Sequence, residues 1–390
     1  MNSQTIKETY DKYIIHTYNR YDVVYDQAEG ATVWDTDGKE YIDLAAGIGV
    51  NCLGYGNSEW TGAVIKQLNK FQHTSNLFYH EPGAVLARKI VERSGLNKVF
   101  FCNSGAEANE VAFKIARKYG NTVADIHKNN IIYLNTSFHG RTITTVTATG
   151  SCGNQERFGP LTPGLIQIEA NNIEQLKEAV AQYNPCALIM ELVQGEGGVT
   201  ALDQVFVDAA VTLCRNNDIL FIDDEVQAGI GRTGRLFAYE YYGFLPDLVS
   251  FAKGIGAGLP IGGVLAGPKA CDVMVPGDHG STFGMNPVVC AGGAVVLDTL
   301  DEPFLAGVRE KAYYLRSQLE AIDEIESTTG LGMMIGINLK TRDFQETAKD
   351  LIAAGAIVIT AIDKIRLLPP LTITYEEIDK ALEVFRKVLG

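Results

Sequence analysis

The sequence predicts an α/β protein with a mostly parallel sheet covered by helices, followed by a smaller α+β domain. Short apolar runs alternate with segments of helical periodicity through the middle of the chain, a pattern typical of β-α-β units. The chain has 390 residues, of which 46% are hydrophobic. That length suggests one large domain with a smaller companion, and the composition is rich enough for a well-packed globular protein.

Six apolar runs are candidate strands of the main sheet: 99–102, 131–134, 187–190, 219–222, 248–251 and 261–266. Helical patterns fill most of the gaps between them, for example at 173–182 and 205–216. The crossovers between parallel strands should be right-handed. Because ligands of parallel sheets gather at the carboxyl ends of the strands, we expect functional residues directly after these runs.

The pattern changes after residue 286. Two long helical patterns lead into short strands and a last helix, at 287–300, 303–322, 334–339, 357–359, 365–368 and 375–389. Near the N-terminus, "ATVWDTDGKEYIDL" predicts a hairpin with Asp37-Gly38 at its turn. We therefore expect a large domain at 61–285, a small domain at 286–390, and an N-terminal segment, 1–60, that packs with the small domain.

Charge and composition exclude several classes of function. The chain has 33 basic and 47 acidic residues, a net charge of −14, which argues against nucleic acid as a partner. No apolar run is long enough to span a bilayer, and the polar start "MNSQTIKETYDKY" has no signal-peptide core. The chain is therefore expected to have no membrane partner.

Cysteine and histidine usage points to the cytoplasm and away from metals. Seven cysteines, none in a C-x-x-C pair, are expected to be reduced thiols; they are Cys52, Cys102, Cys152, Cys186, Cys214, Cys271 and Cys290. The six histidines are scattered and form no H-E-x-x-H pattern, so we expect no metal site.

The segment "FFCNSGAEANEVAFKIARKYG" places a helix start directly after a strand. Ser104 and Glu107 have the spacing of a capping box, and Val111, Ile115 and Tyr119 share one helical face. Either this is an ordinary helix start, or its free N–H groups and positive dipole bind a phosphate, with Gly105 permitting close approach.

In "LFIDDEVQAGIGRTG", an apolar strand runs into Asp223, Asp224 and Glu225. Adjacent carboxylates at the edge of a core repel one another and lose solvation unless a positive group lies nearby. We expect Asp223 to be solvated or capped by backbone groups. The glycines of "GIGRTG" match the dinucleotide fingerprint G-x-G-x-x-G, but they begin six residues after the strand and precede no clear helix, so a nicotinamide site is disfavoured.

Lys253 ends another buried strand, in "SFAKGIGAG". It could be a lysine that simply extends to solvent, or one whose partly desolvated amine forms a Schiff base. A carboxylate at one strand end, an amine at another and a helix N-terminus suit pyridoxal phosphate (PLP). The amine would bond the aldehyde carbon, the carboxylate would pair with the pyridinium, and the helix would hold the phosphate.

These residues resemble a known family. The order of "NSGAEANE", "SFHGRT", "VQGEGG", "DEVQAGIGRTG", "FAKG", "HGSTFGMNP" and "RLLPPL" is similar to that of the class III PLP-dependent aminotransferases. The likeness covers nearly the whole chain. It implies the PLP-dependent transferase fold (fold type I), with a mostly parallel seven-stranded sheet in the large domain.

The resemblance also implies roles for residues around PLP. Lys253 would bond the coenzyme and shuttle a proton, and Asp224 would pair with the pyridinium. The other cofactor contacts would be Gln227 to the phenolic oxygen, Phe138 to the ring face, Ser104, Gly105 and Ala106 to the phosphate, and Thr282 to the phosphate of the neighbouring subunit of a homodimer. Glu225 is given no contact with the ring, and His139 and His279 are interpreted as structural.

For the substrates, the resemblance implies two arginines. Arg141 would bind the α-carboxylate of N2-acetyl-L-ornithine, and Arg366 that of glutamate or 2-oxoglutarate. Glu196 would pair with Arg366 and swing aside for the dicarboxylate, although the pair could also be a permanent structural one. Ser281 is placed with the substrate-binding residues.

The subgroup that the chain resembles most transfers the δ-amino group of N2-acetyl-L-ornithine to 2-oxoglutarate, giving N-acetyl-L-glutamate 5-semialdehyde and L-glutamate in arginine biosynthesis. Ornithine, succinylornithine, N-succinyldiaminopimelate and 4-aminobutyrate remain alternative amine donors. From another class, a nicotinamide-dependent oxidoreductase is the alternative, and so is an inactive relative that acts as a binding protein.

Three stretches depart from the family's usual pattern: Leu192 in "ELVQGEGG", Met285 in "GMNP", and "GYGNSEW" at 54–60. The first implies a local backbone change. The other two lie near the substrate entrance in such proteins, so they affect the expected substrate preference.

Overall fold

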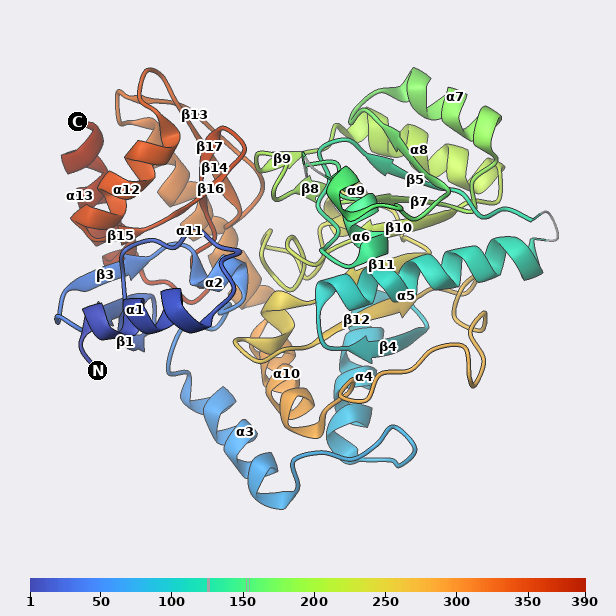
Figure 1. The fold of residues 1–390 in the computed structure, drawn as a ribbon, viewed down its shortest axis with the longest axis horizontal. Coiled ribbons are helices and arrows are strands. Elements are labelled where there is room, and N and C mark those ends of the chain that lie inside the picture. The colour runs from blue at the N-terminus through green and yellow to red at the C-terminus, as the bar shows by residue number, and fades with distance from the viewer. Residues whose placement is uncertain (125–126, 152, 154) are drawn as a thin grey trace.

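The computed structural model describes residues 1–124, 127–151, 153 and 155–390. A seven-stranded sheet forms the centre of its larger part (Figure 1). In spatial order its strands are β4 (Lys98–Cys102), β12 (Gly262–Ala266), β11 (Leu248–Phe251), β10 (Leu220–Asp224), β7 (Ala187–Met190), β5 (Ile131–Leu134) and β6 (Leu165–Ile168). Only β12 runs antiparallel to its neighbours, so the expectation of a mostly parallel seven-stranded sheet is confirmed.

Helices cover both faces of this sheet. One face is covered by α5 (Gly105–Lys118), and the other by α7 (Ile173–Tyr183) and α8 (Gln204–Asn216). Strand β10 shows the alternation, because Ile222 packs in the core with α5 and Phe221 in the core with α8. The same alternation directs the next two side chains, Asp223 and Asp224, to opposite faces of the sheet.

The remaining helices of the larger part lie around and below the sheet in Figure 1. They are α3 (Ser58–Lys70), α4 (Glu81–Ser94), α10 (Pro287–Thr299) and the short α6 (Ile143–Thr147) and α9 (Tyr239–Tyr242). Short helical turns lie at Tyr119–Val123, Gln155–Phe158 and Lys253–Gly256, and β8 (Val193–Gln194) pairs with β9 (Thr200–Ala201).

The smaller part contains a four-stranded sheet in the order β13 (Ile325–Thr329), β14 (Ile335–Leu339), β17 (Lys364–Leu367) and β16 (Ile359–Ala361). Its helices are α11 (Glu302–Glu320), α12 (Phe344–Ala354) and α13 (Tyr375–Leu389). Strand β17 bears Arg366, which lies opposite Gly336 of β14.

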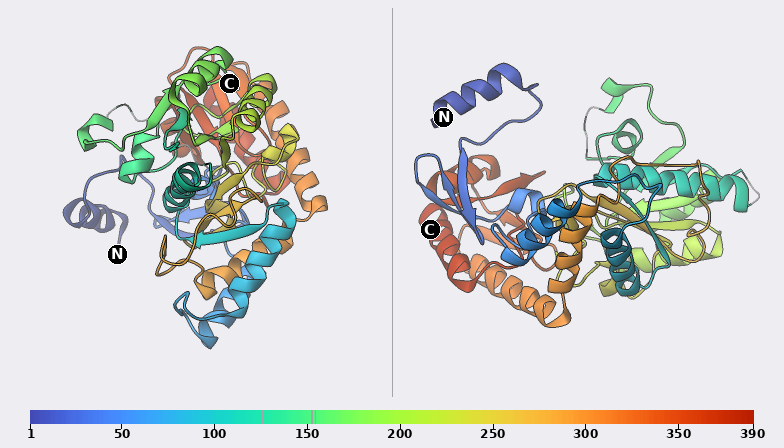
Figure 2. Two further views of the ribbon diagram at one scale, coloured as in Figure 1. Left: turned by 90° about the vertical axis from the view of Figure 1, so that its right-hand side faces the viewer. Right: turned by 90° about the horizontal axis from the view of Figure 1, so that it is seen from below.

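The N-terminal segment joins this smaller part. Its hairpin of β2 (Thr32–Asp35) and β3 (Glu40–Asp43), with β1 (Tyr25–Glu29) on the outside, is completed by β15 (Ala356–Ile357), which pairs with β3. Helix α1 (Ser3–Tyr13) has no buried residue, and Figure 2 shows it standing apart from the main body. After the hairpin, α2 (Ala46–Gly49) leads toward the larger part.

Most of the predicted elements are present within one or two residues of their expected ends. Strand β6 was not predicted. The predicted strand at 357–359 is wrong as a single element, because β15 ends at Ile357 and β16 begins at Ile359 in a different sheet. The limits of the three expected chain segments stay a prediction.

The described cysteines are unpaired, whereas Cys152 lies outside the described residues. In the part of the chain that the structure describes, no helix combines the length and apolar character needed to cross a bilayer. Within the same part, no group of three or more metal-binding side chains comes together.

Candidate active site

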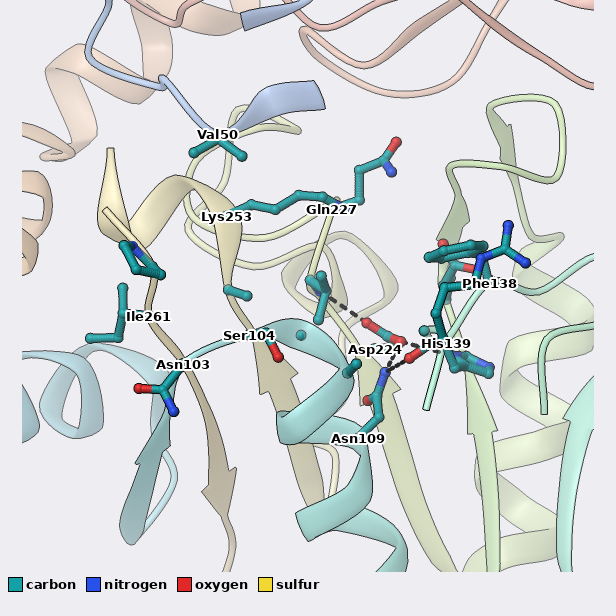
Figure 3. A pocket seen from close by; sticks show the side chains of 18 of the residues that line it. Val50, Asn103, Ser104, Asn109, Phe138, His139, Asp224, Gln227, Lys253 and Ile261 are labelled. Atoms are coloured by element: carbon teal, nitrogen blue, oxygen red, sulfur yellow. Dashed lines mark hydrogen bonds and ion pairs between the residues drawn. The ribbon is translucent and has the colours of Figure 1, made fainter. Parts of the chain in front are cut away.

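A cavity of about 460 Å³ lies at the carboxyl ends of the parallel strands (Figure 3). Its wall is built from residues at or after β4, β5, β7, β10 and β11, as the sequence predicts for a parallel sheet. The structure brings these sequence-predicted residues together in that wall: Ser104, Gly105, Ala106, Phe138, Arg141, Asp224, Gln227 and Lys253.

Asp224 lies in this wall with only 2% of its surface exposed. Its Oδ2 atom accepts a hydrogen bond from Asn109 Nδ2 at 2.7 Å and lies 2.6 Å from His139 Nδ1. Its Oδ1 atom accepts from the backbone N–H of Val226 at 3.0 Å. These contacts fix the plane of the carboxylate, so it is oriented before any ligand binds.

The other two carboxylates of the acidic triplet do not face the cavity. Asp223 is fully buried, and neither of its oxygens meets a hydrogen-bond donor among the described residues, so the expectation of solvation or backbone capping is wrong. Glu225 accepts from the backbone N–H of Tyr239 at 3.1 Å. Burial raises the pKa of both groups, that of Glu225 to about 8, and a proton on Glu225 that is shared with Asp223 would reduce the charge of the pair from −2 to −1.

Lys253 follows β11 in a left-handed backbone conformation, with a φ of 48°. In Figure 3 its side chain and Gln227 lie above Asp224 in the view. Burial lowers the pKa of the Lys253 amine, while the charges of Asp224 and Glu196 act in the opposite direction. The neutral amine, which is the nucleophilic form, is therefore more available than in an exposed lysine.

The N-terminus of α5 forms another part of the wall. Ser104 Oγ accepts from the N–H of Glu107 at 3.2 Å, as the capping box predicts. In a complete capping box, the Glu107 side chain would accept from the N–H of Ser104. Instead, Glu107 Oε2 accepts from the N–H of Asn103 at 2.6 Å, one residue before the cap. At Gly105, a Cβ would lie 2.5 Å from Val226 Cγ1, so glycine allows the helix start to approach the β10 loop.

A buried carboxyl group, Glu191, holds two loops of the wall. It accepts from the N–H of Phe138 at 2.8 Å and from that of Gly195 at 3.1 Å. Burial, followed by the charge of Asp224, raises the pKa of Glu191 to about 7. The Phe138 ring that it positions has the guanidinium carbon of Arg141 5.1 Å from its centroid.

Next to this cavity, Arg366 forms an ion pair with Glu196, with 2.6 Å between Nη1 and Oε1. The Arg366 side chain is 3% exposed, whereas that of Glu196 is 30% exposed. Gln227 Oε1 accepts a second bond from Arg366 Nη1 at 3.2 Å and also lines the cavity. Gln227 therefore links the buried arginine to the cavity wall, whereas the Glu196 side chain is partly exposed to solvent.

Ser281 and Thr282 lie outside the main cavity. They line a neighbouring hollow of about 490 Å³ together with Asn103, whose Nδ2 donates to Ser281 Oγ at 3.1 Å.

Of the three stretches that depart from the family's usual pattern, the first has Leu192, which is fully buried. Tyr55, Asn57 and Trp60, from the 54–60 stretch, line a small hollow that shares Gly258 and Leu259 with the main cavity. Met285 is in neither wall.

Sequence reasoning missed Asn109 and Glu191 and did not foresee the contact of His139. Asn109 follows the α5 cap by five residues. Its position on the inner face of that helix could therefore have been inferred from the sequence. Glu191 directly follows the predicted strand at 187–190, and residues after the strands were expected to form the site. No spacing in the sequence indicates that His139 lies against Asp224.

Comparisons with known proteins agree with this geometry. The model of the family "Aminotransferase class-III" matches residues 13–389. An acetylornithine aminotransferase of Haemophilus ducreyi is 46% identical, with 100% of both chains covered. Among solved structures, an ornithine aminotransferase of Toxoplasma gondii with partial PLP occupancy at its active site matches with a TM-score of 0.94 and 31% identity, covering 100% and 94% of the two chains. An acetylornithine aminotransferase of Elizabethkingia anophelis matches with a TM-score of 0.88 and 32% identity, covering 100% and 99%.

The chain therefore belongs to the class III aminotransferases, and it is a PLP-dependent transaminase. The residues present fit that coenzyme. A preoriented buried carboxylate, an amine of lowered pKa and a helix N-terminus face one cavity, which also has the apolar side chains Phe138 and Val226 in its wall. Membership of this family excludes the alternative interpretation of the chain as a nicotinamide-dependent oxidoreductase, which was based on "GIGRTG".

Proposed function

We propose that this chain transfers the δ-amino group of N2-acetyl-L-ornithine to 2-oxoglutarate, giving N-acetyl-L-glutamate 5-semialdehyde and L-glutamate. The relatives described above as acetylornithine aminotransferases support this substrate. The structural observation that supports it best is the Arg366–Glu196 ion pair beside a cavity that contains Lys253, Asp224 and Arg141. Such a pair suits a site that must accept two substrates of different charge. The corresponding pathway would be arginine biosynthesis.

PLP would be held by the cavity wall. Ser104, Gly105 and Ala106, at the positive end of the α5 dipole, would bind its phosphate, and Phe138 would pack on its ring. Gln227 would donate to its phenolic oxygen. When bound, the coenzyme supplies an electron sink that makes a proton on the amine-bearing carbon of the substrate acidic.

The chain's own residues would control that proton. Asp224, held by His139 and Asn109, would keep the ring nitrogen of the coenzyme protonated through a charge-assisted hydrogen bond. Lys253 Nζ would form the bond that anchors the coenzyme. Once released, the same Nζ would take up the proton from the amine-bearing carbon of the substrate and deliver it to the coenzyme carbon on the other side of the amine nitrogen.

Substrate recognition would depend on the two arginines. Arg141 would bind the α-carboxylate of N2-acetyl-L-ornithine, and Ser281 would contribute a further polar contact. Arg366 would bind a carboxylate of glutamate or 2-oxoglutarate after Glu196 moves aside. While the amine donor is bound, Glu196 would neutralise Arg366, so the buried arginine keeps a partner throughout.

We further propose that the enzyme is a cytoplasmic homodimer. Thr282 is exposed and lies outside the main cavity of its own chain, as expected for a residue that contacts the phosphate in the neighbouring subunit. Sedimentation of the purified protein, with and without Thr282→Ala, would test this. A monomeric PLP-loaded protein would contradict it.

The substrate is tested by single-turnover kinetics of the PLP-loaded protein. We expect kcat/KM for N2-acetylornithine to exceed that for ornithine, succinylornithine, N-succinyldiaminopimelate and 4-aminobutyrate. A marked preference for unacylated ornithine, the substrate of the Toxoplasma relative by its name, would overturn the proposal.

A further inference from the structure

The "GIGRTG" loop has no role in the site described above, yet it contains a buried arginine, Arg232. Arg232 is buried, and no ion pair with a carboxylate joins it to any described residue. Burial lowers the pKa of Arg232 to about 10, so the guanidinium is still charged at neutral pH. A buried charge without a carboxylate is costly, and its contacts therefore call for an explanation.

The hydrogen bonds of the Arg232 side chain go to backbone carbonyls of the smaller part of the molecule, both of them from Nη1, whereas Nη2 has no partner among the described residues. Its Nη1 atom donates to the carbonyl of Pro369 at 2.5 Å and to that of Met333 at 3.2 Å. Its own carbonyl accepts from the N–H of Met333 at 3.0 Å. One side chain of the larger part thus holds two separate segments of the smaller part.

These two segments are the ends of the strand pair that bears Arg366. Pro369 lies two residues after β17, and Met333 lies two residues before β14. Within the pair, Arg366 of β17 lies opposite Gly336 of β14. Arg232 therefore fixes, at one point, the position of both strands relative to the sheet that bears Asp224 and Lys253.

The backbone around this contact is packed tightly on both sides. A Cβ at Gly332 would lie 2.3 Å from the carbonyl carbon of Thr233, so the two loops touch through their main chains. Ile230 is buried with a φ of 54°, a left-handed conformation that is rare and strained for a β-branched residue. Such strain persists only where the surrounding packing holds the backbone in place, so the position of this loop is closely determined.

We propose that Arg232 is a positioning residue that sets the place of Arg366, and with it the affinity of the site for a dicarboxylate. This inference rests on the role proposed above for Arg366. Arg141 is supplied by the segment between β5 and α6, on the larger part, so binding of the acylated amine donor does not depend on the strand pair that Arg232 holds. The effect of losing Arg232 should therefore differ between the two substrates.

The test uses PLP-loaded full-length protein and the variants Arg232→Met and Arg232→Lys. Glutarate, an unreactive dicarboxylate, serves as the binding probe in calorimetry, and the half-reactions with glutamate and N2-acetylornithine are followed by coenzyme absorbance. We expect Arg232→Met to weaken glutarate binding and kcat/KM for glutamate by about 10–100-fold, the scale of a misplaced binding group. The value for N2-acetylornithine should change by less than about threefold, with Arg232→Lys intermediate.

Arg316→Met is the matched control. Arg316 is also buried in part and donates to a carbonyl of the same segment, that of Met334 at 3.2 Å, but it comes from α11 of the smaller part itself. We expect Arg316→Met to lose about as much thermal stability as Arg232→Met. Its kcat/KM values for glutamate and N2-acetylornithine should change by the same factor.

Three results would overturn the proposal: unchanged glutarate affinity in both Arg232 variants, equal losses for both substrates, or the same selectivity in Arg316→Met. If Arg232→Met does not fold, Arg232→Lys decides alone. A wild-type protein that binds glutarate but does not use N2-acetylornithine would refute the substrate proposed above and leave the glutarate comparison valid.

Discussion

The imidazole Nδ1 of His139 lies 2.6 Å from Oδ2 of Asp224, and both side chains are buried. Asn109 Nδ2 donates to the same oxygen, and the backbone N–H of Val226 donates to Oδ1. These three contacts hold the carboxylate in one orientation, which suits a cationic ring nitrogen. This preorganisation is the basis of the first prediction.

Asp224→Asn should lower kcat by about 10²–10³-fold, the range seen when one oriented electrostatic contact is removed from an active site. The amide has the same shape but no charge to stabilise a pyridinium. Single-turnover rates with saturating coenzyme measure the effect. Asp323→Asn, at an exposed position, is the control; equal rates for the Asp224 variant and the wild type would contradict the assignment.

Lys253→Ala should abolish covalent attachment of the coenzyme and lower kcat by at least about a thousandfold. Treatment of the wild type with borohydride should fix the coenzyme on the Lys253 peptide, as found by mass spectrometry, and bleach the yellow protein. Lys387→Ala in α13 is the control and should be labelled like the wild type. Labelling at another lysine would show that the assignment of Lys253 is wrong.

Gly105→Ala should weaken coenzyme binding, because the new methyl group would meet Val226 at the α5 N-terminus. Overpacking of this kind costs about 1–3 kcal/mol, equivalent to a loss of affinity of about 5–150-fold if the whole cost falls on coenzyme binding. Gly307→Ala in α11 is the matched control, since nothing lies within 4 Å of its Cβ position. That variant should bind the coenzyme like the wild type and gain up to about 1 kcal/mol of stability. Equal affinities in the two variants would count against a phosphate site at α5.

Glu196→Ala should shift the balance between the two half-reactions toward glutamate. The variant leaves Arg366 without its ion-pair partner and ready for a dicarboxylate, whereas N2-acetylornithine then meets an unneutralised cation. We expect the ratio of kcat/KM for glutamate to that for N2-acetylornithine to rise by about tenfold, which is about 1.4 kcal/mol. An unchanged ratio would mean that the ion pair is only structural.

Glu225→Gln should change how stability depends on pH. Burial raises the pKa of Glu225 from 4.5 to about 8, so the folded protein keeps a proton that the unfolded chain releases between these values. Its contribution to stability is complete below about pH 4.5 and is lost as the pH rises through about 8, at about 1.4 kcal/mol per pH unit. The variant should therefore show a smaller fall in the free energy of unfolding between pH 6 and pH 9.

Chemical denaturation at several pH values measures this slope. Asp223, whose pKa is also raised by burial, will retain part of the dependence. Glu310→Gln, at an exposed position of α11, is the control and should keep the wild-type slope. A slope for Glu225→Gln as steep as that of the wild type would indicate that the buried pair does not share a proton.

The fold was predictable where the chain has strong local patterns. The runs at 131–134, 187–190 and 248–251 are buried on both faces, because helices cover the sheet on both sides, and their predicted limits agree with the structure. Strand β6 was missed because its Gln167 and its partly exposed residues at the sheet edge give a weak signal. The break at Val358 could not be inferred, because which sheet each half joins depends on partners far along the chain.

The site was predictable in its residue types, and only partly in its network of contacts. Ser104, Asp224 and Lys253 follow strands, which a parallel sheet brings to one edge. The separation of Asp223 from Asp224 follows from strand alternation, yet the burial of Asp223 without a donor depends on packing against the α8 side of the sheet. The contact of His139 with Asp224 joins residues 85 positions apart, and no local pattern encodes it.

The pairing of β3 with β15 has a consequence for biosynthesis. The hairpin emerges from the ribosome early, but the strand that completes its sheet is translated more than 300 residues later. At about 5–20 residues per second, the exposed edge of β3 waits for tens of seconds before its partner arrives. The edge of β3 is therefore unpaired during most of synthesis, and the small sheet can reach its final form only after translation of the chain is nearly complete.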